Sequence, residues 1–342
     1  MESTFVPASV QRPMYPILAQ QETPQVLLIP AIEAKQPARL PFIEANTKEV
    51  EMTHLKEDCI IPVFSKDNEV TISHQSFIDV IMEAAQAAFP NESFSDPAIR
   101  VSHVVKGRIP EAIHKPVNQL LESDKTIYYE RMMFCFEIPS IFQTIDGCRL
   151  NLTIGGVRAY NEQNLYSRKS PEKFKIFIGF KNLVCCNLCV STDGYQSCLR
   201  VMDLTAMLSA AEELFRGYDM ARHLATMAAY QTVALSESQF AQFLGRCRLY
   251  QYLPSSERKL LPEMLLTDTQ VSAVARSYYE DGDFGRKDNP AISLWKVYNL
   301  LTGSNKISYI DNFLDRAENA TAITTGIARA MHGDPQYSWF LG

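Results

Sequence analysis

Residues 173–194 read KFKIFIGFKNLVCCNLCVSTDG and contain two strand-like runs that meet at Lys181 and Asn182. Lysine and aromatic residues alternate in the first run, and this period of two predicts strands over 174–180 and 183–191. The alternation divides the first run into two sets: Lys173, Lys175 and Phe177 on one face, and Phe174, Ile176 and Ile178 on the other. Because neighbouring side chains of a strand point to opposite faces, we expect the apolar set in the core and the lysine set on a wet face.

The segments before this pair extend it into a sheet of hairpins. Strands are expected over 99–105, 126–137 and 148–154, after two short ones over 58–63 and 69–73. Turn signals lie at Asp146-Gly147 and at Gly155-Gly156, and the second is interpreted as a hairpin bend. Short connections of this kind join antiparallel neighbours, so a largely antiparallel sheet is predicted.

After residue 203 the pattern becomes helical. Apolar residues recur every three or four positions over 204–230, which predicts one long amphipathic helix. Capping and stop signals predict four more helices: 240–253 (Ser236 with Gln239), 271–279 (Thr267 with Gln270), 291–301 (opened by Asn289-Pro290) and 308–331 (closed by Gly333). One earlier helix, over 77–88, is expected to be capped by Ser73 or Ser76. An antiparallel sheet of hairpins followed by a helical C-terminal half belongs to the α+β class.

Three regions follow from these patterns. Prolines at positions 7, 13, 16, 24, 30, 37 and 41 disfavour helix, so residues 1–50 are expected to form an extended arm. A mainly β region with one helix is expected over 51–203, and a helical region that packs on the sheet over 204–342. The last two are expected to form one continuous domain, since 342 residues suit one large domain or two unequal ones.

Composition and charge exclude several classes of protein. Hydrophobic residues make up 46% and charged residues 21%, which excludes a mostly disordered chain. The net charge of −6 argues against a protein that is basic all over. The longest apolar runs are too short to span a bilayer, so no membrane partner is expected. Eight cysteines without a secretory signal predict reduced thiols and a cytoplasmic location.

No pattern in the chain predicts catalysis. The six histidines form no metal-type pair, no nucleophile motif is present, and no glycine-rich loop ends in Lys-Ser/Thr, so neither catalytic residues nor a cofactor are predicted. The strongest metal hypothesis rests on Cys185, Cys186, Cys189 and Cys198. In the predicted strand Cys185 and Cys189 share a face that Cys186 does not, and a second ligand pair is missing. Buried core cysteines are the favoured interpretation, and no metal site is predicted.

Residues 149–181 carry the one concentrated basic stretch in the sequence. They hold seven cationic and two anionic side chains, a local charge of +5 that leaves −11 for the rest of the chain. Aromatic residues are interleaved with the cations, a combination typical of surfaces that bind phosphates and stack on bases. The predicted nucleic-acid contacts are Arg158, Arg168, Lys169, Lys173 and Lys175 for phosphates and Tyr160 and Tyr166 for bases. The alternative is a solvated hairpin whose lysines protect a sheet edge.

Four segments carry a family resemblance: GRIPEA (107–112), ERMMFCFEIPS (130–140), FKNLVCCNLC (180–189) and LWKVYNLLTG (294–303). They resemble an uncharacterised, phage/plasmid-like family of bacterial mobile-element proteins. That family has a strand with a Val-Cys-x-Asn core, matched here by Val184, Cys185 and Asn187, and a Trp-x-x-x-Asn-x-x-Thr helix, matched by Trp295, Asn299 and Thr302. This chain departs from the family at Cys186 and at Leu188-Cys189, where the family continues with Thr-Leu. The resemblance implies a mobile-element context and a fold, but no active site.

The order of several antiparallel strands followed by a long helix is similar to the core of phage single-strand annealing proteins. Those proteins form oligomeric rings with a basic groove along the sheet, so the similarity implies a homo-oligomer that acts in DNA recombination. The expected function is therefore non-enzymatic, with binding or annealing of single-stranded DNA as the activity. The alternative is a protein-interaction or scaffold module of a mobile element that does not bind nucleic acid.

Overall fold

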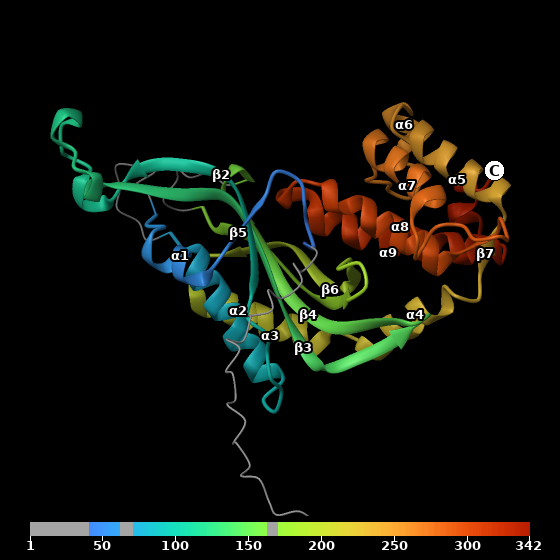
Figure 1. Cartoon of the computed structure of the whole chain (residues 1–342), viewed down its shortest axis with the longest axis horizontal. Helices are drawn as coiled ribbons and strands as arrows, with labels where there is room; N and C mark the ends of the chain where they lie inside the picture. Colours follow the sequence, from blue (N-terminus) through green and yellow to red (C-terminus); the bar gives the residue numbers. More distant parts are fainter. Residues whose placement is uncertain (1–40, 62–70, 163–169) are drawn as a thin grey trace, which may run out of the picture. The chain divides into compact units, whose positions relative to one another are not determined.

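A six-stranded antiparallel sheet forms the N-terminal half of the fold (Figure 1). The computed structural model describes residues 41–61, 71–162 and 170–342. The strands are β1 (Lys48–Val50), β2 (Ala98–Arg108), β3 (Lys125–Ile145), β4 (Cys148–Ala159), β5 (Glu172–Asn182) and β6 (Leu188–Val201). Each strand pairs with the next along the chain, so the sheet is a meander. The sheet of hairpins followed by helices confirms the predicted α+β fold.

Helices cover both faces of the sheet. On one face lie α2 (His74–Ala88) and α3 (Leu204–Gly217), and Phe77 of α2 packs against Phe134 and Phe174. On the other face, the first half of α9 (Ile310–Met331) packs on the alternate residues of the same strands. Phe313 of α9, for example, belongs to one buried cluster with Phe177 of β5. The alternation predicted for 173–178 is confirmed in β5. The expectation of a wet face is wrong for Lys175 and Phe177, because both are buried under α9.

Gly155 and Gly156 lie inside strand β4. The expectation of a hairpin bend at these two glycines is therefore wrong. A Cβ atom on Gly155 would come within 2.1 Å of the Phe134 carbonyl oxygen. A Cβ on Gly156 would lie 2.5 Å from Cζ of Phe77. These two positions therefore serve the close approach of β3 and α2 to β4. The β3–β4 hairpin turns instead at Asp146 and Gly147, with φ of 50° and 74°, as predicted.

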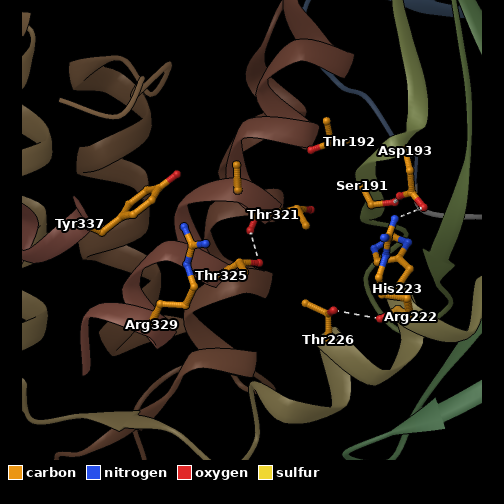
Figure 2. Close-up of a pocket in the computed structure, with 11 residues that line it drawn as sticks. Ser191, Thr192, Asp193, Arg222, His223, Thr226, Thr321, Thr325, Arg329 and Tyr337 are labelled. Carbon is orange, nitrogen blue, oxygen red and sulfur yellow. Dashed lines mark hydrogen bonds and ion pairs between the residues drawn. The ribbon is translucent and has the colours of Figure 1, made fainter. Parts of the chain in front are cut away.

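A large bulge interrupts β6, the edge strand. Val190 pairs with Gly179 and Tyr195 with Phe177, so four residues of β6, Ser191–Gly194, lie opposite Ile178 alone. Bulges of this kind re-aim side chains and are common beside functional sites. Figure 2 shows Ser191, Thr192 and Asp193 of the bulge across a pocket from Thr321, Thr325 and Arg329 of α9.

The C-terminal half is helical. Besides α3 and α9 it contains α4 (Met220–Ala229), α5 (Glu237–Tyr250), α6 (Ser255–Arg258), α7 (Asp268–Glu280), α8 (Leu294–Ser304) and a two-stranded sheet of β7 (Ala234–Leu235) and β8 (Ile292–Ser293). Short 3₁₀ helices cover Pro110–Ala112, Val117–Gln119, Glu122–Asp124, Tyr160–Glu162, Asn305–Ile307 and Pro335–Phe340. The predicted capping boxes of α5 and α7 are confirmed.

Two predicted helices differ from the structure. The single helix expected over 204–230 is broken at Tyr218, and Asp219 caps the second part, α4, by accepting from the Arg222 amide. Asn289 does not open the helix expected over 291–301, because residues 292 and 293 pair with β7 and Ser293 becomes the cap of α8. In both cases the helix begins later than predicted or begins again, because a residue inside the predicted range serves as an N-cap.

Near the N-terminus, the expectations were met in part. Ser73 caps α2 as predicted. The strand expected over 58–63 is absent from residues 58–61, which follow the short helix α1 (Met52–Glu57), and the rest of it lies outside the described residues. Most of the proline-rich arm lies outside them as well, but Lys48–Val50 joins the sheet. Among the helices of the described residues, none has the length and apolar character that a membrane crossing requires.

Candidate functional site

Arg158, predicted to contact phosphate, lies in the interior of the protein. Its side chain is 0% exposed, and its guanidinium lies between the rings of Tyr160 and Phe174, 4.3 and 4.4 Å from their centroids. It donates to the Ile72 carbonyl and to the Glu172 carboxylate. The prediction is wrong for Arg158 in this conformation, because its side chain is fully buried against the two rings and donates to Ile72 and Glu172.

Tyr160 is also unavailable for base stacking. The side chain is buried against Arg158, and its hydroxyl lies 2.9 Å from the hydroxyl of Tyr128. His74 stacks on Tyr128 in the same cluster, where burial and the nearby Arg158 charge lower the pKa of His74 to about 3. The histidine is therefore neutral, and the cluster anchors the start of α2 to the sheet.

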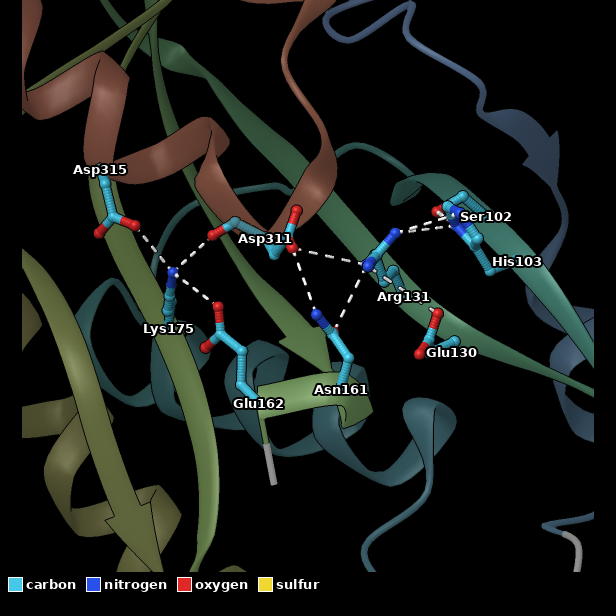
Figure 3. A network of polar contacts seen from close by, with 9 residues as sticks. All are labelled: Ser102, His103, Glu130, Arg131, Asn161, Glu162, Lys175, Asp311 and Asp315. Atoms are coloured by element: carbon cyan, nitrogen blue, oxygen red, sulfur yellow. Dashed lines mark hydrogen bonds and ion pairs between the residues drawn. The ribbon is translucent and has the colours of Figure 1, made fainter. Parts of the chain in front are cut away.

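Lys175 is held by the helix that covers the sheet. It is 8% exposed, and Nζ donates to the Asp315 carboxylate at 2.8 Å, to Glu162 at 3.5 Å and to the Asp311 carbonyl (Figure 3). Two of these three oxygens belong to the first turns of α9. Lys175 therefore fixes α9 to β5, and the prediction that it contacts phosphate is wrong for the described conformation.

The contacts of Lys175 extend into a wider polar network. Arg131 on β3 lies 3.6 Å from the Asp311 carboxylate, and its Nη1 lies 3.0 Å from His103 on β2 (Figure 3). Asn161, which follows β4, donates to the same Asp311 carboxylate at 3.4 Å. Charged and polar contacts thus bind the N-terminal end of α9 to β3, to β5 and to the turn that follows β4.

Lys173 has a different environment from Lys175. It points to the same face of β5 but lies beyond the N-terminal end of α9, where it is half-buried. Its direct neighbour across the ladder is Arg200 on β6, which is exposed. Lys173 is the one predicted contact among the described residues that remains near the surface. The predicted contacts Tyr166, Arg168 and Lys169 lie outside the described residues.

Two of the three cysteines of the opening motif lie outside a strand, although all three were expected in one. Cys185 and Cys186 occupy the turn between β5 and β6, where Cys186 has φ of 58°, and Cys189 is buried in β6. Burial raises the pKa of both Cys185 and Cys189 to about 12, so these thiols stay protonated. Within the described part of the chain, no group of three histidine, cysteine or acidic residues has the arrangement of a metal site.

This turn docks on α8 through a buried amide cluster. Asn182 donates to the side-chain oxygen of Asn299, and Asn187 donates to the Asn299 carbonyl, each at 3.0 Å. The Asn299 amide in turn donates to the Trp295 carbonyl at 2.9 Å, and Lys306 donates to the Cys185 carbonyl. Two motifs more than a hundred residues apart in the sequence therefore meet at one point, where they join the sheet to the helical half.

Sequence reasoning missed the pocket beside the bulge of β6. Its polar groups come from three separate elements: Asp193 from β6, Arg222 and His223 from α4, and Arg329 from α9. Only tertiary contact brings them together. The signal in the sequence was the run Ser-Thr-Asp-Gly at 191–194, since polar residues and glycine interrupt an otherwise apolar strand.

Comparison with known proteins gives one match. The family model described as "Domain of unknown function, B. Theta Gene description (DUF3871)" matches residues 23–341. The chain belongs to this family. The match to DUF3871 includes every described residue except Gly342, and so both halves of the fold. No curated protein and no solved structure matches the chain.

Proposed function

We propose that this member of DUF3871 binds single-stranded nucleic acid at the open end of the β5–β6 hairpin, where β5 begins and β6 ends. One observation carries the proposal: Lys173 and Arg200 lie directly opposite each other in the ladder. Two cations at directly opposed positions concentrate positive charge at one point of the sheet, which attracts an anion. A phosphate backbone would supply such an anion.

The revised contact surface is smaller than the predicted one. Arg158, Tyr160 and Lys175 no longer belong to it, because they are buried among protein partners. Lys173 stays, and Arg200 is added because the register of β6 brings it there. Arg168, Lys169 and Tyr166 remain predicted contacts, since they closely precede Lys173 in the sequence.

The test is fluorescence anisotropy with labelled single-stranded DNA over a salt series. The variant is the double charge reversal Lys173→Glu with Arg200→Glu. The affinity falls as salt rises, and on a single strand each phosphate contact contributes about −0.7 to the slope of log K against log salt. The double variant should therefore make this slope less steep by about 1.4. Affinity at low salt should fall strongly, because two attractive contacts become repulsive.

A matched control reverses two exposed cations of the helical half, Lys259→Glu with Arg276→Glu, and changes the net charge equally. It should keep most of the affinity and the slope of the unmodified protein. The proposal is wrong if no binding occurs at low salt, or if the control loses as much affinity as the Lys173/Arg200 variant. Either result would favour the scaffold alternative instead.

The mobile-element context, annealing activity, self-association and a cytoplasmic location belong to the same proposal. The cytoplasmic part is supported by the cysteines, five of which are buried as free thiols. The meander followed by helices supports the comparison with annealing proteins at the level of element order. Single-strand annealing assays with complementary oligonucleotides, together with the mass in solution with and without DNA, test these parts.

A further inference from the structure

The pocket beside the bulge of β6 has one wall built by the bulge itself. Ser191 donates to one oxygen of the Asp193 carboxylate at 2.7 Å. The other Asp193 oxygen accepts from the Asp219 amide at 3.1 Å and from Nη2 of Arg222 at 2.7 Å. Gly194 permits this geometry, since a Cβ there would lie 2.2 Å from the Ile178 carbonyl oxygen. The bulge therefore directs a carboxylate at the start of α4 and orients Arg222 toward the cavity.

The second wall is one face of α9. Thr321, Thr325 and Arg329 follow each other at intervals of four residues, so they share this face. The Arg329 guanidinium is held from behind by Asp334 at 3.4 Å, by Gln336 at 3.3 Å and by the Tyr337 ring. The contacts of both arginines with described residues use Nε and Nη2. A guanidinium has five donors, so further donors remain for a ligand.

His223 lies deep in this pocket with half of its hydrogen-bonding capacity unused. The residue is 3% exposed, and Nδ1 lies 2.7 Å from the Tyr218 hydroxyl. Nε2 has no hydrogen-bond partner among the described residues. Burial lowers the pKa of His223 to about 4 although the Asp193 charge opposes this, so the ring is neutral near pH 7. A buried polar atom without a partner is costly, and a ligand atom would satisfy it.

The side chains that line the cavity carry a net positive charge. Arg222 and Arg329 contribute two positive charges to the lining and Asp193 one negative charge, so the net charge of the lining is +1. A second cavity begins on the other side of the contact between Thr192 and Glu318, and its lining is −2, from Glu263, Asp315 and Glu318 against Arg316. The two cavities differ in sign although Thr192 borders both. The first encloses about 490 Å³, a size typical of small-molecule sites.

We propose that the pocket between the β6 bulge, α4 and α9 binds a small phosphate ester that carries hydroxyl groups (Figure 2). Arg222 and Arg329 would bind the ligand from opposite walls, and Arg329 would take the phosphate, since a guanidinium group binds two phosphate oxygens at once. The Asp193 carboxylate and the hydroxyl of Thr192, which itself donates to Glu318, would accept hydrogen bonds from the ligand hydroxyls. This site is separate from the Lys173–Arg200 surface and does not depend on it.

The experiment measures binding to the full-length protein by isothermal titration calorimetry, with ribose 5-phosphate, inorganic phosphate and ribose as probes. Ribose 5-phosphate should bind most tightly, inorganic phosphate more weakly and ribose not measurably. Arg329→Gln should weaken ribose 5-phosphate binding about ten-fold or more, because one of the two guanidinium contacts is lost. Arg276→Gln, an exposed arginine on α7, should leave the affinity unchanged.

A second readout reports the position of the ligand. The imidazole nitrogen resonances of His223 should shift when ribose 5-phosphate is added, and those of the exposed His114 should not. Arg222→Gln also removes a partner of Asp193 and could unfold the α4 end, so Arg329→Gln is the decisive variant. The proposal is overturned if Arg329→Gln and Arg276→Gln bind alike, if ribose binds as well as its phosphate, or if His223 does not respond. The Lys173/Arg200 double variant should bind ribose 5-phosphate normally, so either proposal can fail alone.

Discussion

The cations of β4 and β5 and the arginines that face the bulge of β6 border the same sheet but differ in their exposure to solvent. Arg158 and Lys175 come from the most basic stretch of the sequence, and both are buried with protein partners. Arg222 and Arg329 come from unremarkable amphipathic helices, and their side chains stay 66% and 52% exposed at the rim of a cavity. A concentration of charge in a sequence thus marks an interior network as readily as a binding surface.

The physical reason lies in the partners that each group finds. Glu172 and the carboxylates of α9 neutralise the β4 and β5 cations, and burial excludes water from them. The arginines of the pocket also have carboxylate partners, Asp193 and Asp219 for Arg222 and Asp334 for Arg329, but more than half of each arginine side chain is exposed. Removing a buried partner should therefore affect stability, whereas removing a rim arginine should affect binding.

The largest expected effect is on the buried side of the comparison. Arg158→Ala should lower the free energy of unfolding by about 3–5 kcal/mol, because Glu172 and the Ile72 carbonyl lose their partner and a void opens between two rings. Urea denaturation measures this loss. Arg276→Ala, the exposed control, should change stability by less than about 0.5 kcal/mol. Equal effects of the two variants would contradict a structural role for Arg158.

A smaller effect is expected from His223 as the pH falls. Its pKa is lower in the folded protein, about 4, than the ordinary value of 6.5, so unfolding lets it take up a proton. Its contribution to stability is complete above pH 6.5 and is lost progressively as the pH approaches 4, on the order of 3 kcal/mol in all. His74, with a pKa of about 3, acts in the same direction.

His223→Gln should therefore flatten the decline of stability between pH 6.5 and 4 without abolishing it. Unfolding free energies from urea titrations at several pH values measure the slope. His114→Gln, at an exposed position, should keep the slope of the unmodified protein. If His223→Gln keeps that slope as well, the neutral buried state assigned to His223 is wrong.

The smallest effect is expected at the end of the β5–β6 hairpin. Lys173→Glu with Arg200→Glu replaces one pair of like charges with another at the same cross-strand position, so stability should change by less than about 0.5 kcal/mol. Thermal unfolding measures this. A large loss would mean that the pair belongs to the interior network with Lys175, and the sharp division between the two regions would no longer hold.

Local signals allowed part of this fold to be predicted. Asp146-Gly147 predicted the β3–β4 turn because that turn requires a positive φ, which glycine and aspartate tolerate. Ser236 with Gln239 and Thr267 with Gln270 predicted two helix starts, since a capping box is a contact within four residues. The candidate pocket could not be predicted, because its polar groups approach only after α4 and α9 have packed beside β6.

By itself, the sequence determined the antiparallel sheet of hairpins followed by helices and the two-sided alternation of β5, which depend on neighbouring residues. Only the tertiary structure decided which face of β5 meets water, because the covering helix α9 lies more than a hundred residues later in the chain. It also decided that Gly155-Gly156 serves close packing, and that the bulge at Ser191–Gly194 opens into a cavity. These features depend on contacts between distant segments, and no local pattern of residues specifies such contacts.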